Sequence, residues 1–223
     1  MSNQLPTIER ETGPDPVASI IILHGLGADG NDFVPFVDEL DLRAVGGVRF
    51  IFPHAPTRPV TINGGYVMRA WYDIFGADLV RREDEAGLRA SHAQVAALVE
   101  RERARGIDSK RIVLAGFSQG CAMALMTGLR EPQAIGGIVG MSGYLPLAAA
   151  FEAERASANQ HTPIFLAHGR FDPVVAFERG VATRDLLQQL GHPVEWHEYP
   201  MQHSVCAEEV ADLNRWLLRV LVG

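Results

Sequence analysis

Cysteine, basic charge and long apolar runs are all scarce in this chain of 223 residues. The two cysteines, Cys121 and Cys206, are too few for a disulfide scaffold or a zinc cluster, which fits a reducing compartment. Lys and Arg number 20 against 27 Asp and Glu, and the resulting net charge of −7 argues against binding to a nucleic-acid backbone. No uninterrupted apolar run is long enough to predict a membrane-spanning helix.

Two further absences concern targeting and metals. Residues 1–10 have neither the basic cluster nor the apolar stretch of a secretory signal peptide, so we expect a cytoplasmic protein. The sequence contains no His-Glu-x-x-His helix and no Cys-x-x-Cys pair, and we expect no bound metal.

Apolar residues are plentiful enough for a core. The chain is 47% hydrophobic and 21% charged, with a mean hydropathy of +0.03, which is typical of a folded soluble protein. Its length fits one domain of ordinary size, and no internal repeat or flexible linker divides it. We therefore expect a single domain over residues 1–223.

Short β-branched runs alternate along the chain with longer helical stretches. The runs show little polar alternation, which is typical of strands covered on both faces, and they lie at 17–23, 48–53, 111–117, 135–141, 163–167 and 194–199. Helices are predicted at 83–105, 120–129, 177–190 and 206–221. This alternation predicts the α/β fold class, as a three-layer sandwich around a mainly parallel central sheet.

The carboxyl ends of parallel strands meet at one edge of a sheet, where ligands bind. The strand 111–117 ends in Gly116-Phe117-Ser118-Gln119-Gly120, directly before a helical stretch. This matches the Gly-x-Ser-x-Gly nucleophile elbow, in which a serine with a strained backbone joins a strand to a helix. Ser118 is therefore the candidate nucleophile, and the alternative is that it only caps the helix.

A serine hydroxyl needs an imidazole to remove its proton and a carboxylate to orient that imidazole. In this fold class the acid and then the histidine follow the serine along the chain. Asp172 follows the strand 163–167 and His203 follows the strand 194–199, so both reach the same edge as Ser118. We expect these three residues to form a triad; the alternative for Asp172 is a turn residue.

Main-chain N–H groups must also face the oxyanion that forms on the substrate. The residue after the nucleophile, Gln119, supplies one, and we expect Leu26 to supply the other from the glycine-rich turn after the strand 17–23. His24 precedes the glycines of this turn, which suits an anchor better than a catalytic base.

The segment 55–73 is long, contains several Pro and Gly residues and shows no periodicity, so we expect an irregular functional loop over the catalytic edge. Together with neighbouring loops it is predicted to form the substrate-binding wall, with Phe33, Ile62, Met68, Trp71, Val174 and Val175. For Trp71 and Tyr72 the alternative is that their rings fasten the loop to the core.

Seven short motifs occur in order across nearly the whole chain. They are LHGLGADGNDF at 23–33, FPHAP at 52–56, WYD at 71–73, GFSQG at 116–120, SGYLP at 142–146, HGRFDPV at 168–174 and YPMQH at 199–203. In this combination the sequence resembles the small carboxylesterases and acyl-protein thioesterases of the α/β-hydrolase fold, over about residues 17–220.

The resemblance implies a serine hydrolase with no large lid domain and no cofactor, in which Ser118, Asp172 and His203 form the triad and Leu26 and Gln119 the oxyanion hole. It implies small-molecule esters or thioesters of small to medium acyl chains, acylated proteins or lysophospholipids as substrates, cleaved through an acyl-enzyme intermediate. A lysophospholipase-like hydrolase is one alternative. A non-catalytic binding protein of the same fold is another, although such proteins usually lack a triad residue.

Two positions depart from the family pattern. Gln202 stands where many relatives have Gly before the histidine, which concerns the backbone of that loop and not the base itself. Animal members carry a lipid on a cysteine near the N-terminus, whereas residues 1–10 contain no cysteine, so no stable membrane anchor is expected. The sequence leaves open whether the chain forms a homodimer.

Overall fold

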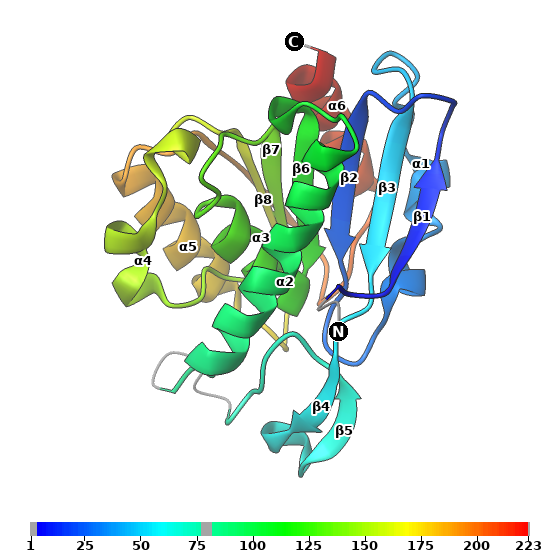
Figure 1. Ribbon diagram of the computed structural model, residues 1–223. Helices are drawn as coiled ribbons and strands as arrows, with labels where there is room; N and C mark the ends of the chain where they lie inside the picture. The colour runs from blue at the N-terminus through cyan, green and yellow to red at the C-terminus, as the bar shows by residue number, and fades with distance from the viewer. Residues whose placement is uncertain (1–3, 77–81, 223) are drawn as a thin grey trace.

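A central sheet of seven strands organises the molecule, in the order β1-β3-β2-β6-β7-β8-β9 (Figure 1). The computed structural model describes residues 4–76 and 82–222. The strands of this sheet are β1 (Thr7–Glu11), β2 (Ala18–Leu23), β3 (Val48–Pro53), β6 (Ile112–Phe117), β7 (Gly137–Met141), β8 (Ile164–Gly169) and β9 (Val194–Tyr199). In this sheet every neighbouring pair of strands from β3 to β9 is parallel, and the edge strand β1 runs antiparallel to β3. The predicted α/β fold with a mainly parallel sheet is therefore confirmed.

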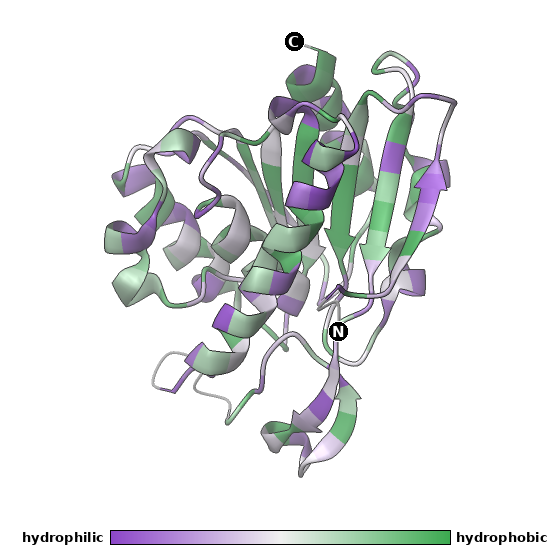
Figure 2. Cartoon of the chain, in the orientation of Figure 1, coloured by the Kyte–Doolittle hydropathy of each residue, from purple (hydrophilic) through white to green (hydrophobic). Residues whose placement is uncertain are grey.

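Helices cover both faces of the sheet, because successive side chains of each strand point to opposite faces. The helices are α1 (Phe36–Glu39), α2 (Glu85–Ala104), α3 (Gln119–Gly128), α4 (Ala148–Glu154), α5 (Phe177–Gln189) and α6 (Ala207–Val222). In β2, Ile21 and Leu23 pack in one core with side chains of α2, α3 and α5, whereas Ile20 and Ile22 pack in a second core with α1 and α6. The central strands are accordingly apolar, and the edge strand β1 is largely polar (Figure 2).

The segment 55–73, predicted to be irregular, instead contains a hairpin. β4 (Thr57–Val60) pairs antiparallel with β5 (Tyr66–Arg69), and a 3-10 turn at Thr61–Asn63 lies between them. Gly64 and Gly65 have positive φ values of 66° and 80°, which glycine adopts without strain, and they let the chain reverse. The hairpin projects from the carboxyl edge of the main sheet (Figure 1), so the segment lies at the predicted edge in a conformation that was not predicted.

The sequence prediction also omits β1, α1 and α4. These elements are short, and β1 is mostly exposed, so they carry little periodic apolar signal. Among residues 4–76 and 82–222, no helix has the length and apolar character needed to cross a membrane.

The opposite edge of the sheet holds a buried ion cluster around Glu102 of α2, which is fully buried. Ser19 Oγ and Arg49 Nη1 donate to Glu102 Oε2 at 2.7 and 2.8 Å. Arg105 Nη1 donates to the other carboxylate oxygen at 3.0 Å. Burial alone would raise the pKa of Glu102, but the hydrogen bonds from Arg49 and Ser19 outweigh it and lower that pKa below its ordinary value. The cluster ties α2 to the beginnings of β2 and β3.

Candidate active site

The elbow at the end of β6 places Ser118 between a strand and a helix. Ser118 has φ 57° and ψ −118°, the strained backbone of a nucleophile elbow, and its N–H donates to the Met141 carbonyl at 2.9 Å. Glycines permit this turn: a Cβ on Gly116 would collide with the Gly120 carbonyl, and a Cβ on Gly120 with the Leu23 carbonyl. The strand, the strained residue and the helix occur in the order that the motif predicts.

The Ser118 hydroxyl does not cap the helix that follows it, which was the alternative to a nucleophile. Ser118 is the N-cap residue of α3, yet its side chain makes no capping hydrogen bond to that helix. The residue is 8% exposed and lines a cavity at the carboxyl edge of the sheet. Its oxygen is therefore placed to meet a ligand.

His203 and Asp172 meet next to the elbow, on the loops that follow β9 and β8. Nδ1 of His203 lies 2.6 Å from Oδ2 of Asp172, and its ring packs on Phe117 with 4.7 Å between ring centroids. The other carboxylate oxygen of Asp172 accepts the N–H groups of Val174 and Val175, both at 2.8 Å. Asp172 is thus a turn residue and the partner of His203 at once. With the proton on Nδ1, Nε2 of His203 is the basic nitrogen.

Two other histidines at this edge are held as structural residues. Nε2 of His24 accepts the Ala55 N–H at 3.0 Å, and Nδ1 donates to the Gly25 carbonyl at 2.7 Å. His168 lies in β8, and its Nε2 donates to the carbonyl of Val175, on the loop that follows, at 2.8 Å. Burial lowers the pKa of both rings, so both stay neutral. His24 therefore anchors the glycine-rich turn, as its sequence position predicts.

The predicted oxyanion donors, Leu26 and Gln119, line the same cavity as Ser118. Gln119 is the first residue of α3, so its N–H has no partner four residues earlier within that helix. The turn that carries Leu26 is held by the Gly27 N–H, which donates to the Arg69 carbonyl of β5 at 2.9 Å. Both residues therefore border the space beside Ser118, as two oxyanion donors would have to do.

The Gln119 side chain, only 3% exposed, fastens the segment 70–73 to the elbow. Its Oε1 accepts the Trp71 N–H and its Nε2 donates to the Tyr72 carbonyl, each at 3.0 Å. The Trp71 indole N–H donates to the His24 carbonyl at 2.9 Å, and Ser91 Oγ donates to the Trp71 carbonyl. Trp71 is fully buried. Of its two predicted roles, the structure therefore favours fastening the loop to the core.

The cavity beside Ser118 has a volume of about 380 Å³ and mostly apolar walls. Ile62 enters it from the hairpin turn, and Val174 and Val175 enter it from the loop that carries Asp172. The structure therefore brings these three predicted wall residues together with the nucleophile. We call this space the acyl cavity.

Three other predicted wall residues lie outside the acyl cavity. Trp71 is buried behind it, and half-buried Met68 of β5 lies near Asn63, whose Nδ2 is 3.4 Å from the Met68 sulfur. Phe33 packs against Phe117, with 6.1 Å between ring centroids, and lines a separate cavity. A sequence without periodicity indicates which segment borders a site, but it does not indicate where each side chain points.

Two tyrosines that were not predicted as wall residues line the acyl cavity. Tyr72 and Tyr144 are 3% and 8% exposed, and their hydroxyl oxygens lie 3.0 Å apart. Burial raises the pKa of Tyr144 to about 12, so its hydroxyl stays protonated. Tyr144 lies three residues after the end of β7, so the rule that site residues follow parallel strands was the signal that could have identified it.

The sheet order, the strained serine and the hydrogen-bonded acid and histidine define the class of protein as a serine hydrolase with the α/β-hydrolase fold. The family model for phospholipases and carboxylesterases matches residues 4–221. The chain belongs to the phospholipase/carboxylesterase family.

Across the described ranges, no group of three or more His, Cys, Asp or Glu side chains is arranged as metal ligands would be.

Relatives of known name cover most of the chain. Acyl-protein thioesterase 1 of Neurospora crassa is 41% identical over 222 residues, which span 96% of this chain and 89% of that protein. Acyl-protein thioesterase 1 of Yarrowia lipolytica is 40% identical over 205 residues, or 90% of each protein. The crystal structure of Arabidopsis thaliana SOBER1 aligns with a TM-score of 0.87 at 30% identity, covering 92% of this chain and 99% of that chain. For Zea mays acyl-protein thioesterase 2 the TM-score is 0.84 at 29% identity, with 96% and 99% covered.

Proposed function

We propose that the protein hydrolyses carboxylic esters and thioesters of small to medium acyl chains through a covalent intermediate on Ser118. The observation that carries the proposal is the 2.6 Å hydrogen bond between Asp172 and His203, next to a serine with a strained backbone. The named relatives, which are acyl-protein thioesterases, support the same chemistry.

His203 acts twice in the proposed reaction. Its Nε2 takes the Ser118 proton as Oγ attacks the acyl carbon, and Asp172 stabilises the imidazolium through Nδ1. The tetrahedral oxyanion faces the N–H groups of Leu26 and Gln119. When the carbon–oxygen or carbon–sulfur bond to the leaving group breaks, His203 gives the proton to the departing alcohol or thiol. A water molecule deprotonated by His203 then hydrolyses the acyl-serine ester and restores the free enzyme.

The acyl chain of the substrate is proposed to occupy the acyl cavity. Ile62, Ile74, Val174 and Val175 provide apolar contacts there. Each methylene group that the cavity takes out of water contributes about 0.8 kcal/mol to binding, which favours acyl chains over the bare acetyl group. The buried hydroxyl pair of Tyr72 and Tyr144 adds a polar patch to these walls.

Several substrates share this acyl chemistry, among them acylated proteins, lysophospholipids and small esters or thioesters. The names of the relatives favour acylated proteins among them. A non-catalytic binding protein is the competing interpretation, and it predicts no turnover of any ester. A cytoplasmic location stays a prediction, which cell fractionation with an antibody to the protein would test.

The test measures hydrolysis of 4-nitrophenyl octanoate and of an S-octanoyl thioester. Ser118→Ala and His203→Asn are compared with Ser142→Ala, which removes a buried hydroxyl after the neighbouring strand β7. We expect Ser118→Ala and His203→Asn to lose about a thousandfold or more in kcat, and Ser142→Ala to retain turnover. Wild-type rates in Ser118→Ala would overturn the proposal. Near-UV circular dichroism of each variant checks that it is folded.

A further inference from the structure

The candidate base stands next to a second cavity, which differs in chemistry from the acyl cavity. This space of about 370 Å³ lies between α1 and the beginning of α6, and we call it the α1–α6 cavity. His203 and Cys206 line one side of it, and Phe33, Phe36 and Phe117 contribute aromatic rings. It shares no lining residue with the acyl cavity.

The role of His203 determines which part of a substrate would enter the α1–α6 cavity. The general acid must reach the leaving oxygen or sulfur, so that atom lies on the His203 side of the reacting carbon. Ser118, Leu26 and Gln119 line the acyl cavity on the other side. A group bonded to the leaving atom is therefore directed past the Phe117 ring, which packs on His203, toward α1.

The charge in the α1–α6 cavity is of one sign. Asp32 and Glu39 are exposed where they line it, and none of the described residues that line it is Lys or Arg. The neighbouring acid on α1, Asp38, is instead 3.2 Å from Arg10 and does not line the cavity. Apart from the catalytic imidazole of His203, a substrate group in this cavity therefore meets two carboxylates and no Lys or Arg among its described walls.

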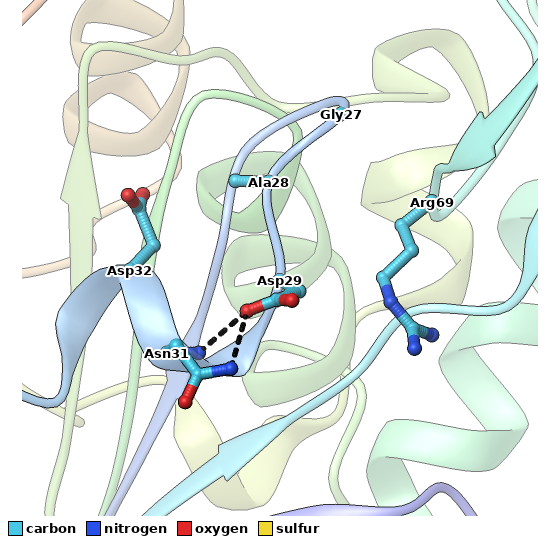
Figure 3. A pocket seen from close by; sticks show the side chains of 6 residues that line it. All are labelled: Gly27, Ala28, Asp29, Asn31, Asp32 and Arg69. Carbon is cyan, nitrogen blue, oxygen red and sulfur yellow. Dashed lines mark hydrogen bonds between the residues drawn. The ribbon is translucent and has the colours of Figure 1, made fainter.

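Asp32 also borders a shallow hollow of about 570 Å³ beyond the oxyanion turn (Figure 3). In that hollow the Asp29 carboxylate accepts two hydrogen bonds from Asn31, from its main-chain nitrogen at 2.8 Å and its side-chain nitrogen at 3.0 Å. These bonds lower the pKa of Asp29. Arg69 lies across the hollow from Asp32 in Figure 3 and donates to the Ala55 carbonyl at 2.8 Å. Figure 3 shows no hydrogen bond between the Asp32 carboxylate and the other residues drawn, and Asp32 is exposed, so its charge is accessible to a ligand.

We propose that the α1–α6 cavity receives the leaving group, and that Asp32 and Glu39 make the enzyme favour leaving groups with positive charge over those with negative charge. The inference rests on the proposed function, because only acyl transfer gives His203 a leaving group to protonate. The preferred leaving group is an alcohol or thiol that carries an ammonium or guanidinium group near the scissile bond. A cysteine flanked by basic residues and a choline-type alcohol both have this chemistry.

The first experiment compares octanoylcholine with 3,3-dimethylbutyl octanoate, in which a neutral carbon replaces the quaternary nitrogen. Each kcat/KM is divided by the hydroxide-catalysed rate of the same ester, so that differences in intrinsic reactivity cancel. We expect the wild-type protein to favour the cationic ester by about fivefold at low salt, since two exposed charges contribute modestly in water. The preference should shrink as added salt shortens the screening length.

Two double variants locate the preference. Asp32→Asn/Glu39→Gln should abolish it, because both carboxylates of the cavity lose their charge. The control Asp38→Asn/Glu152→Gln changes the net charge equally through two exposed acids that do not line the cavity, and it should retain the preference. A preference that survives in Asp32→Asn/Glu39→Gln would overturn the assignment to these residues.

A second set of substrates separates small cations from peptides. S-Octanoyl cysteine is placed in a short peptide between two Lys or between two Glu, and the same corrected ratio is measured. A preference for the Lys peptide that disappears in Asp32→Asn/Glu39→Gln supports peptide leaving groups, and a preference limited to the choline ester supports small cationic alcohols. Equal corrected rates for every pair, with hydrolysis proceeding, would overturn this inference and leave the proposed function intact. Absence of turnover on all substrates would overturn the proposed function and this inference with it.

Discussion

The side-chain oxygen of Gln119 lies 3.0 Å from the main-chain nitrogen of Trp71, so the residue after the candidate nucleophile also holds a wall of the acyl cavity. Its side-chain nitrogen binds the next carbonyl, that of Tyr72. One residue thereby carries the proposed oxyanion donor in its main chain and positions the segment 70–73 through its side chain. The helix start, the elbow and the wall are fixed relative to one another.

We expect Gln119→Ala to lower kcat/KM by about 10- to 100-fold, although the main-chain N–H remains. The substitution leaves a buried N–H of Trp71 and a buried carbonyl of Tyr72 unpaired, and each costs about 1–3 kcal/mol. Steady-state kinetics and thermal unfolding are measured together. Gln119→Met, which keeps the side-chain volume without either hydrogen bond, serves as the matched variant. Full activity in Gln119→Met would show that the two hydrogen bonds do not position the wall.

Ile62 tests the assignment of the acyl cavity. It lines that cavity and is 45% exposed, whereas Val67 on the same hairpin is 59% exposed and does not line it. At about 0.8 kcal/mol per methylene group, we expect Ile62→Ala to lower kcat/KM for an octanoyl ester roughly tenfold and for an acetyl ester little. Val67→Ala should change neither rate. Equal losses for both esters in Ile62→Ala, with a lower melting temperature, would mean that Ile62 is structural.

Glu102 tests the ion cluster at the far edge of the sheet. Its removal leaves the guanidinium of Arg49, which is 8% exposed, without its buried partner. We expect Glu102→Ala to reduce the free energy of unfolding by about 3–5 kcal/mol in urea titrations at pH 7. Because the folded-state pKa of Glu102 is lowered, this stabilisation is present above its ordinary pKa and is lost as the pH falls below about 4. A wild-type stability that stays above the variant's by the same amount down to pH 2 would contradict this account.

Glu209 gives a pH dependence of the opposite sign. It is fully buried in the first turn of α6, and burial raises its pKa to about 8. In the unfolded chain the carboxyl ionises near its ordinary pKa, so the folded state keeps a proton that the unfolded state releases. The free energy of unfolding should therefore fall by up to about 1.4 kcal/mol per pH unit between the two pKa values and level off above pH 8.

Glu209→Gln removes this titration and keeps the side-chain volume. We expect the variant and the wild type to have similar stability near pH 5, and the variant to be more stable by about 2–4 kcal/mol near pH 8.5. Urea titrations across that range measure the difference. Parallel curves for the two proteins would mean that Glu209 is already ionised in the folded state.

Much of the fold was predictable because buried parallel strands are continuous apolar runs. β2, which lies within the predicted run 17–23, is buried along its whole length, and its end determined where the glycine-rich turn lies. β1 escaped prediction because a polar edge strand looks like a loop. The hairpin of β4 and β5 escaped prediction because its strands have four residues each, although Gly64-Gly65 was a turn signal.

The site divides in the same way. Ser118, Asp172 and His203 each follow a strand, so strand ends alone place them at one edge. The walls depend on which way a side chain points within a loop, and the sequence carries no period there to show it. Met68 and Trp71, which were predicted as wall residues, accordingly proved to lie outside the acyl cavity. Tyr72 and Tyr144, which were not predicted, line it.

Covalent labelling of the nucleophile tests the central claim most directly. The wild-type protein is treated with a fluorophosphonate, and the modified residue is identified by mass spectrometry of the digested protein, with Ser118→Ala as the control. We predict one added phosphonyl group per chain, carried by Ser118, and no labelling of Ser118→Ala, because only a serine activated by His203 reacts rapidly. Labelling of a different serine such as Ser142, or undiminished labelling of Ser118→Ala, would contradict the account.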